Sequence, residues 1–284
     1  MGDNEAAQKP DWAERGRVAT AALAETWGSL AEVCHALVTQ EWDLPTECPG
    51  WTVKDQLSHL IGIERMLLGQ PTPPWDGPLG DHVKNDFAAD NEKWIAVRRA
   101  WPGDTVLAEF HEVTALRLAA LGALSDEAWA AVGFSPVGQV PYAEFMDVRV
   151  YDSWVHEQDV RRALDRPGGS GGRASVIALQ RVQAAMGFVV GKQAAAPEGS
   201  VVRFEVTGPG GDGRRIVIGV EGGRARPVAP GTEPTVALTM SSLDLTRLGC
   251  GRASADQVEA AGGIGVEGDA ALGQKILASM NFMF

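Results

Sequence analysis

Three side chains on two predicted helices could together bind one divalent metal ion. Asp152 and His156 stand four residues apart in VRVYDSWVHEQDVRRAL, so a helix presents both on one face, one turn apart. A carboxylate and an imidazole at this spacing suit Zn²⁺, but a third ligand must come from another helix. His59 is the best candidate, because it lies among apolar residues in the amphipathic segment VKDQLSHLIGIERMLL and should point inward. Taken singly, each residue is more commonly a hydrogen-bonded, partly buried side chain.

The other histidines give weaker signals. His82 follows a Pro/Gly-rich loop that could reach the mouth of a site, although a solvent-facing role is the simpler expectation. His35 lies beside Cys34 on an N-terminal helix, where adjacent residues do not face one another. We expect His111 to lie on an exposed helical face.

Acidic residues near the predicted ligands are expected to be ordinary surface charges. We expect Glu157 and Asp159 to lie on other faces of the same helix and to pair with Arg161, Arg162 or solvent. Hydrolysis by zinc-bound water would need a general base, for which Glu64 is the nearest suggestion. We expect Glu64 to be a helix-surface charge instead.

Nucleophile and phosphate-loop chemistries find little support. No arrangement for a serine nucleophile is indicated. GPGGDG at 208–213 lacks the Lys-Ser/Thr of a phosphate loop and sits between β-rich runs, which predicts a hairpin turn. The cysteines Cys34, Cys48 and Cys250 are widely spaced and form neither a disulfide framework nor a CxxC motif. They fit a reducing cytoplasm, and Cys48 is the one nearest a site helix.

Length and charge limit the class of protein. A chain of 284 residues with 45% apolar residues can bury a sizeable core, and its net charge of −12 argues against nucleic acid and anionic membranes as partners. The N-terminus is polar, and no stretch of about 18 apolar residues occurs. We therefore expect a cytoplasmic protein. A monomer and a homodimer both remain open, and its partner is expected to be a small molecule.

The order of predicted elements divides the chain into two domains, an all-α domain followed by an α+β domain. Residues 1–166 should form an up-and-down four-helix bundle with few strands, because apolar residues recur at helical spacing. The helices are expected at 11–40, 53–69, 84–99, 104–124 and 142–165. The segment RPGGSGG at 166–172 has the composition of a linker.

Residues 173–284 should form a smaller α+β domain with a mostly antiparallel sheet. A helix is expected at about 174–192, before β-rich runs separated by Gly/Pro turns. Strands are predicted at 201–206, 214–220, 225–228, 235–240 and 263–268, with short helices near 241–249 and 269–280.

LPTECPGWTVKDQLSHLIGIE and YDSWVHEQDVRRALDRPG together resemble the mycothiol-dependent maleylpyruvate isomerase family, within the wider group of DinB-like bundles. The likeness extends to NEKWIAVRRAWPGDTVLAEFHEVTALRLAAL and SPVGQVPYAEFMDVRV. In the second domain it rests on SSLDLTRLGCGRAS and VEGDAALGQKILASMNFMF, which look like the family's sterol-carrier-like companion domain.

This resemblance implies an activity and a set of site residues. It implies that His59, Asp152 and His156 bind a catalytic divalent metal, with zinc expected and iron, nickel or manganese compatible with the same ligands. It also implies mycothiol or a similar thiol as cofactor, whose metal-bound thiolate attacks an electrophile such as maleylpyruvate. The family's catalytic arginine best matches Arg252, with Arg247 as the alternative and a structural salt bridge as a further one. Members can have Glu where this chain has Asp152.

Several functions remain open from the sequence. A thiol-dependent isomerase and an S-transferase would share the metal and thiolate and differ in substrate. A non-enzymatic carrier with a structural metal and an apolar ligand in the second domain is an alternative from another class, and a zinc-water hydrolase is a third. Zinc with three protein ligands favours catalysis over a structural role.

Overall fold

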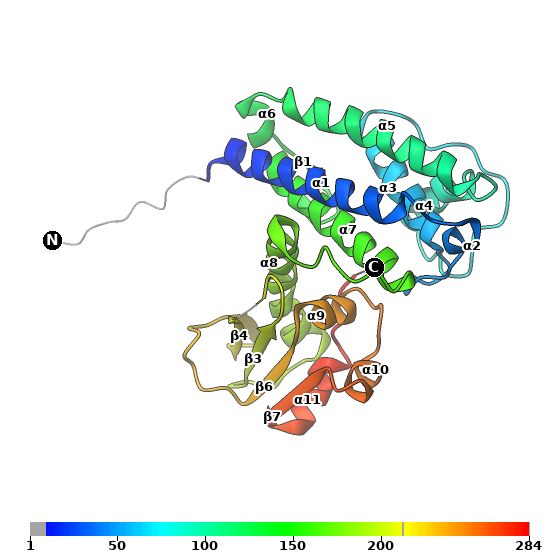
Figure 1. Cartoon of the computed structure of the whole chain (residues 1–284). Coiled ribbons are helices and arrows are strands. Elements are labelled where there is room, and N and C mark those ends of the chain that lie inside the picture. Colours follow the sequence, from blue (N-terminus) through cyan, green and yellow to red (C-terminus); the bar gives the residue numbers. More distant parts are fainter. Residues whose placement is uncertain (1–9, 212, 284) are drawn as a thin grey trace. The chain divides into compact units, whose positions relative to one another are not determined.

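The computed structural model describes residues 10–211 and 213–283 of the chain. Over these residues, contacts divide the chain into two compact units. The first contains the residues up to Trp42 together with Lys54–Ser153, and the second contains Asp43–Val53 and the residues from Trp154 onward. Figure 1 shows both, with helices in the first unit and a sheet with helices in the second.

Helices make up almost all of the regular structure up to residue 163. The four long ones described there are α1 (Trp12–Cys34), α3 (Val53–Leu67), α5 (Gly103–Gly122) and α7 (Tyr142–Ala163). Short helices lie between them: α2 (Thr39–Trp42), α4 (Asp86–Ala96) and α6 (Asp126–Ala130). The prediction of a helical N-terminal region is confirmed. A two-stranded antiparallel hairpin, β1 (Val132–Ser135) and β2 (Gly138–Pro141), precedes α7.

Direct contacts arrange the long helices as a bundle. Helix α1 packs against α5, and Nε1 of Trp27 on α1 donates to Oγ of Ser153 on α7 across 3.1 Å. Nε of Arg65 on α3 donates to Glu109 on α5 across 2.6 Å. Buried apolar side chains fill the space between the helices, among them Leu23, Leu30, Leu57, Leu60, Ile61, Phe110, Val113, Met146 and Val150. A bundle core of this kind can hold polar side chains at fixed positions on facing helices.

The second unit is built around a five-stranded sheet, over the part of it that the structure describes. Its strands are β3 (Val201–Thr207), β4 (Arg214–Glu221), β5 (Arg224–Pro227), β6 (Val236–Ser241) and β7 (Ile264–Gly268), in the order β5-β4-β3-β6-β7. Strands β3 and β6 are parallel, with Val202 opposite Val236, and the other pairs are antiparallel. The predicted mostly antiparallel sheet is confirmed. Strands β3 and β4, on either side of GPGGDG in the sequence, are an antiparallel pair, and Asp212 of that segment lies outside the described residues.

Helices cover this sheet. Those that contact its strands are α8 (Gly172–Phe188), which continues into a π-helical turn η1 (Val189–Gln193), α9 (Ser242–Gly249) and α11 (Ala270–Leu277). A further helix, α10 (Ala255–Ala260), lies between α9 and α11 in the chain. Helix α10 was not predicted. It begins at a capping box in which Ser254 and Gln257 exchange hydrogen bonds. This local signal is easy to overlook because the helix that follows has only six residues.

By length and composition, Gly172–Gln193 is apolar enough to cross a membrane. Half of its most apolar window is buried, and α8 packs against β4, β5 and α9. Its apolar side chains, such as Val182 and Met186, are buried, as is usual for a helix that packs in a protein core.

Candidate metal centre

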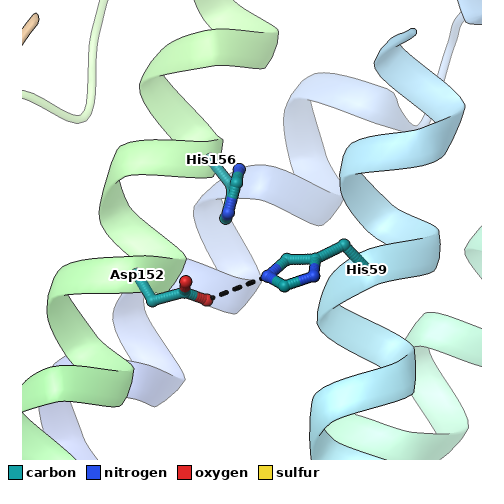
Figure 2. A group of neighbouring side chains, drawn as sticks. All are labelled: His59, Asp152 and His156. Carbon is teal, nitrogen blue, oxygen red and sulfur yellow. Dashed lines mark hydrogen bonds and ion pairs between the residues drawn. The ribbon is translucent and has the colours of Figure 1, made fainter. Parts of the chain in front are cut away.

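The structure brings His59, Asp152 and His156 together. Their candidate ligand atoms all lie within 4.8 Å of one another, and Nε2 of His59 lies 3.4 Å from Oδ2 of Asp152. His59 comes from α3, whereas Asp152 and His156 lie one turn apart on α7 (Figure 2). The two histidines expose only 4% and 5% of their surface.

The donor set fits a divalent metal ion. Imidazole nitrogens and carboxylate oxygens bind Zn²⁺ at about 2.0–2.2 Å, so two such ligands at a tetrahedral angle lie roughly 3.3–3.6 Å apart. The 3.4 Å between His59 and Asp152 falls in this range, whereas it is long for a strong charge-assisted hydrogen bond. Two imidazoles and one carboxylate are also a ligand set used by catalytic zinc sites.

A buried chain of charges supports Asp152 from behind. Nη1 of Arg149 donates to Oδ2 of Asp152 across 2.8 Å, and the same guanidinium donates to Oε1 of Glu64 from Nε and Nη2 at 2.9 and 2.7 Å. The other oxygen of Glu64 accepts from Nε of Arg117 across 2.9 Å. The expectation that Glu64 is a surface charge is therefore wrong. It is 1% exposed, because two arginines from α5 and α7 compensate the cost of burying its charge.

The positive and negative charges in this row of paired side chains are equal in number. Two guanidinium groups, Arg117 and Arg149, face two carboxylates, Glu64 and Asp152. Burial disfavours the charged form of Arg149, but the nearby carboxylates of Glu64 and Asp152 outweigh it and raise the pKa of Arg149. Asp152 therefore meets a fixed positive charge on one side and the two histidines on the other.

A second buried carboxylate lies beside His156. Oδ2 of Asp159 lies 3.5 Å from Nδ1 of His156, and Asp159 also accepts from Nε of Arg252 at 3.2 and 3.0 Å. The expected pairing of Asp159 with Arg161, Arg162 or solvent is wrong, because the side chain is 1% exposed and faces Arg252. Burial opposes its ionisation, but His156 and Arg252 prevail and lower the pKa of Asp159.

The CPGW turn places an aromatic ring against His156. The ring centroids of Trp51 and His156 are 5.7 Å apart. The turn is closed by hydrogen bonds from the Trp51 amide to the Cys48 carbonyl and from the Thr46 amide to the Trp51 carbonyl. Gly50 adopts φ +80°, which a residue with a Cβ rarely tolerates. The turn thus fixes the position of Trp51, and Trp51 limits the movement of the His156 ring.

The remaining sequence candidates lie elsewhere. Arg247 pairs with Glu47 and Asp244, and Glu157 pairs with Arg161 as expected. His82 contacts the buried carboxylate of Glu92 across 2.9 Å. His35 and His111 are exposed.

Sequence reasoning missed Arg149 and Asp159 as supporting residues, although a signal was present. Arg149, Asp152, His156 and Asp159 follow one another at spacings of three, four and three residues, which places all four on one face of α7. Four ionisable residues on the buried face of a helix are unusual, because buried charges must be paired. Arg117 and Glu64 lie on different helices and carry no comparable pattern.

Fold and site together define a helical bundle with a His-His-carboxylate cluster, whose histidines are buried, joined in one chain to an α+β unit. A family model described as the mycothiol maleylpyruvate isomerase N-terminal domain matches residues 8–161, and one described as the MDMPI C-terminal domain matches residues 177–275. The chain belongs to the mycothiol-dependent maleylpyruvate isomerase family.

Solved structures share this fold. The crystal structure of the mycothiol-dependent maleylpyruvate isomerase is similar with a TM-score of 0.53 at 18% identity, over 90% of this chain and 92% of that one. A histidine-to-alanine mutant of that isomerase gives a TM-score of 0.52 with the same identity and coverage. No curated protein matches the chain.

Proposed function

We propose that this chain is a metal-dependent isomerase or S-transferase that uses mycothiol, or a similar thiol, against an electrophilic substrate such as maleylpyruvate. The observation that carries the proposal is the grouping of two buried histidines, His59 and His156, with the partly exposed Asp152 in a member of this family. Zinc is the proposed metal, and the reducing cytoplasm, which keeps a thiol cofactor reduced, is the proposed compartment.

The three residues would hold the metal through two neutral imidazole nitrogens and one carboxylate oxygen. A bound divalent metal supplies positive charge that stabilises a thiolate at neutral pH. Arg149 keeps the Asp152 carboxylate directed at His59, and its charge offsets that of Asp152. Because Arg149 offsets the charge of Asp152, the three protein ligands would neutralise little of the metal's positive charge. That charge would remain available to stabilise a thiolate.

We also propose that Arg252 takes part in the reaction. Its guanidinium is joined through the buried carboxylate of Asp159 to His156, so a change at Arg252 reaches a proposed metal ligand. The zinc-water hydrolase is less well supported, because both oxygens of Glu64 accept hydrogen bonds from arginines and Glu64 cannot serve as its general base.

The test is an assay of the zinc-loaded protein with mycothiol and each of two substrates. Formation of fumarylpyruvate from maleylpyruvate, only when mycothiol is present, indicates the isomerase. Consumption of the thiol by a general alkylating electrophile, without isomerisation, indicates the transferase. The His59→Ala variant should lose either activity, whereas His111→Ala, at an exposed histidine, should keep it. Zinc-loaded protein inactive in both assays would refute the proposal.

A further inference from the structure

We propose that Asp159 and Arg252 form a positioning pair that sets the ring of His156 for metal binding. The proposal rests on the metal site put forward above. It assigns Arg252 a role that acts through Asp159 and His156, without contact with the substrate.

The geometry on α7 defines what Asp159 does. Asp159 follows His156 by three residues, so its carboxylate lies against the ring nitrogen Nδ1 at 3.5 Å. A carboxylate at this place favours the proton on Nδ1, which leaves Nε2 with its lone pair as the ligand atom. In Figure 2 one ring nitrogen of His156 points towards Asp152 and His59, as this tautomer requires.

The guanidinium of Arg252 pairs with groups of the protein itself. Its Nε and Nη2 face Asp159, with Nη2 3.0 Å from Oδ2, and its Nη1 donates to the carbonyl oxygen of Cys250 across 3.2 Å. The cavity beside this pair measures about 10 Å³, which is scarcely one water molecule. It is lined by Trp154, Asp159, Arg162, Arg247, Cys250 and Arg252, among others. Each of these donors of Arg252 thus has a partner within the protein.

Removing either member should therefore disturb His156. Without Arg252, the buried carboxylate of Asp159 loses the guanidinium that holds it in place, so it turns away from the ring. Without the carboxylate, the His156 ring loses the group that selects its tautomer. Residues that support a metal ligand in this way typically change metal affinity by about 10- to 100-fold when they are replaced.

The test measures zinc affinity of the full chain by competition with a chromophoric chelator, with no thiol or substrate present. We expect Asp159→Asn and Arg252→Met to raise the zinc Kd by about 10- to 100-fold. Arg247→Met is the matched control, because Arg247 lines the same cavity but pairs with Glu47 and Asp244, and its Kd should stay within about threefold of the wild type.

A second measurement needs no variant that could misfold. Nitrogen NMR of the wild-type apo-protein should show the neutral His156 ring with its proton on Nδ1, and a proton on Nε2 would overturn the proposal. So would an unchanged zinc Kd in folded Arg252→Met accompanied by a raised KM, because that result makes Arg252 a substrate-binding group. Wild-type protein that binds no zinc would instead refute the metal site itself.

Discussion

Nη1 of Arg149 and Oδ2 of Asp152 are joined by a 2.8 Å hydrogen bond, and this same oxygen lies 3.4 Å from Nε2 of His59. The same oxygen of Asp152 thus contacts both the Arg149 guanidinium and the ring of His59. Because Arg149 also binds Glu64, which binds Arg117, the position of Asp152 depends on charges from three helices.

This relationship predicts strong coupling between Arg149 and Glu64. Arg149→Met leaves the buried carboxylate of Glu64 and the partly exposed one of Asp152 short of a partner, and should lower the free energy of unfolding by about 3–5 kcal/mol. In a Glu64→Gln background the same change should cost less, since one of the stranded charges is already gone. Urea unfolding of the metal-free proteins gives all four values of this cycle. Equal costs in both backgrounds would show that Arg149 and Glu64 are not coupled.

Metal stoichiometry should depend on each of the three cluster residues. Wild-type protein purified without added metal should retain about one equivalent of divalent metal, whereas His59→Ala, Asp152→Ala and His156→Ala should each lose most of it, because two remaining ligands rarely hold the ion. Elemental analysis after dialysis measures this, with His111→Ala as an exposed control. Full retention by His59→Ala and His156→Ala would place the metal elsewhere.

Stability should depend on pH through Glu109. Burial favours the neutral carboxyl, but hydrogen bonds and charges from Arg98 and Arg65 outweigh it and lower the pKa of Glu109 below its ordinary value of 4.5. The stabilisation is therefore complete above that value and is lost as pH falls through the lower folded-state pKa. The difference in unfolding free energy between wild type and Glu109→Gln should be largest above about pH 5.5 and shrink towards pH 3.

Denaturant unfolding across this pH range provides the measurement for Glu109. Glu112→Gln serves as the control, because that side chain is 63% exposed and should show a small difference at every pH. A Glu109→Gln difference that does not change with pH would mean that the ion pairs contribute nothing through ionisation.

The turn that carries Trp51 should be sensitive to its glycine. Gly50→Ala forces a Cβ into φ +80° and should cost about 1–2 kcal/mol of stability, because left-handed backbone is unfavourable for L-residues. Gly28→Ala, on an exposed face of α1 with no neighbouring atom within 4 Å, should instead gain about 1 kcal/mol. Thermal unfolding of both variants tests the contrast, and a stabilised Gly50→Ala would contradict it.

Elements with long periodic patterns could be predicted from the sequence, whereas several of the short ones were missed. The long helices α1, α3, α5 and α7 and strands β3, β4 and β6 carry apolar spacing over many residues, which is a local property of the chain. Helix α10 and the hairpin of β1 and β2 have only four to six residues per element, too few for a period to stand out. Their formation depends on caps, turns and neighbours.

The sequence by itself determined the pairing of Asp152 with His156, because a helix fixes the relation of residues four apart. It also favoured His59 as their partner, through its place on an apolar helical face. Only the tertiary structure decided that Glu64 and Asp159 are buried and not surface charges. Their counter-charges, Arg117 on another helix and Arg252 far along the chain, come within hydrogen-bonding distance only when the chain folds, and no local pattern specifies which distant charges will meet.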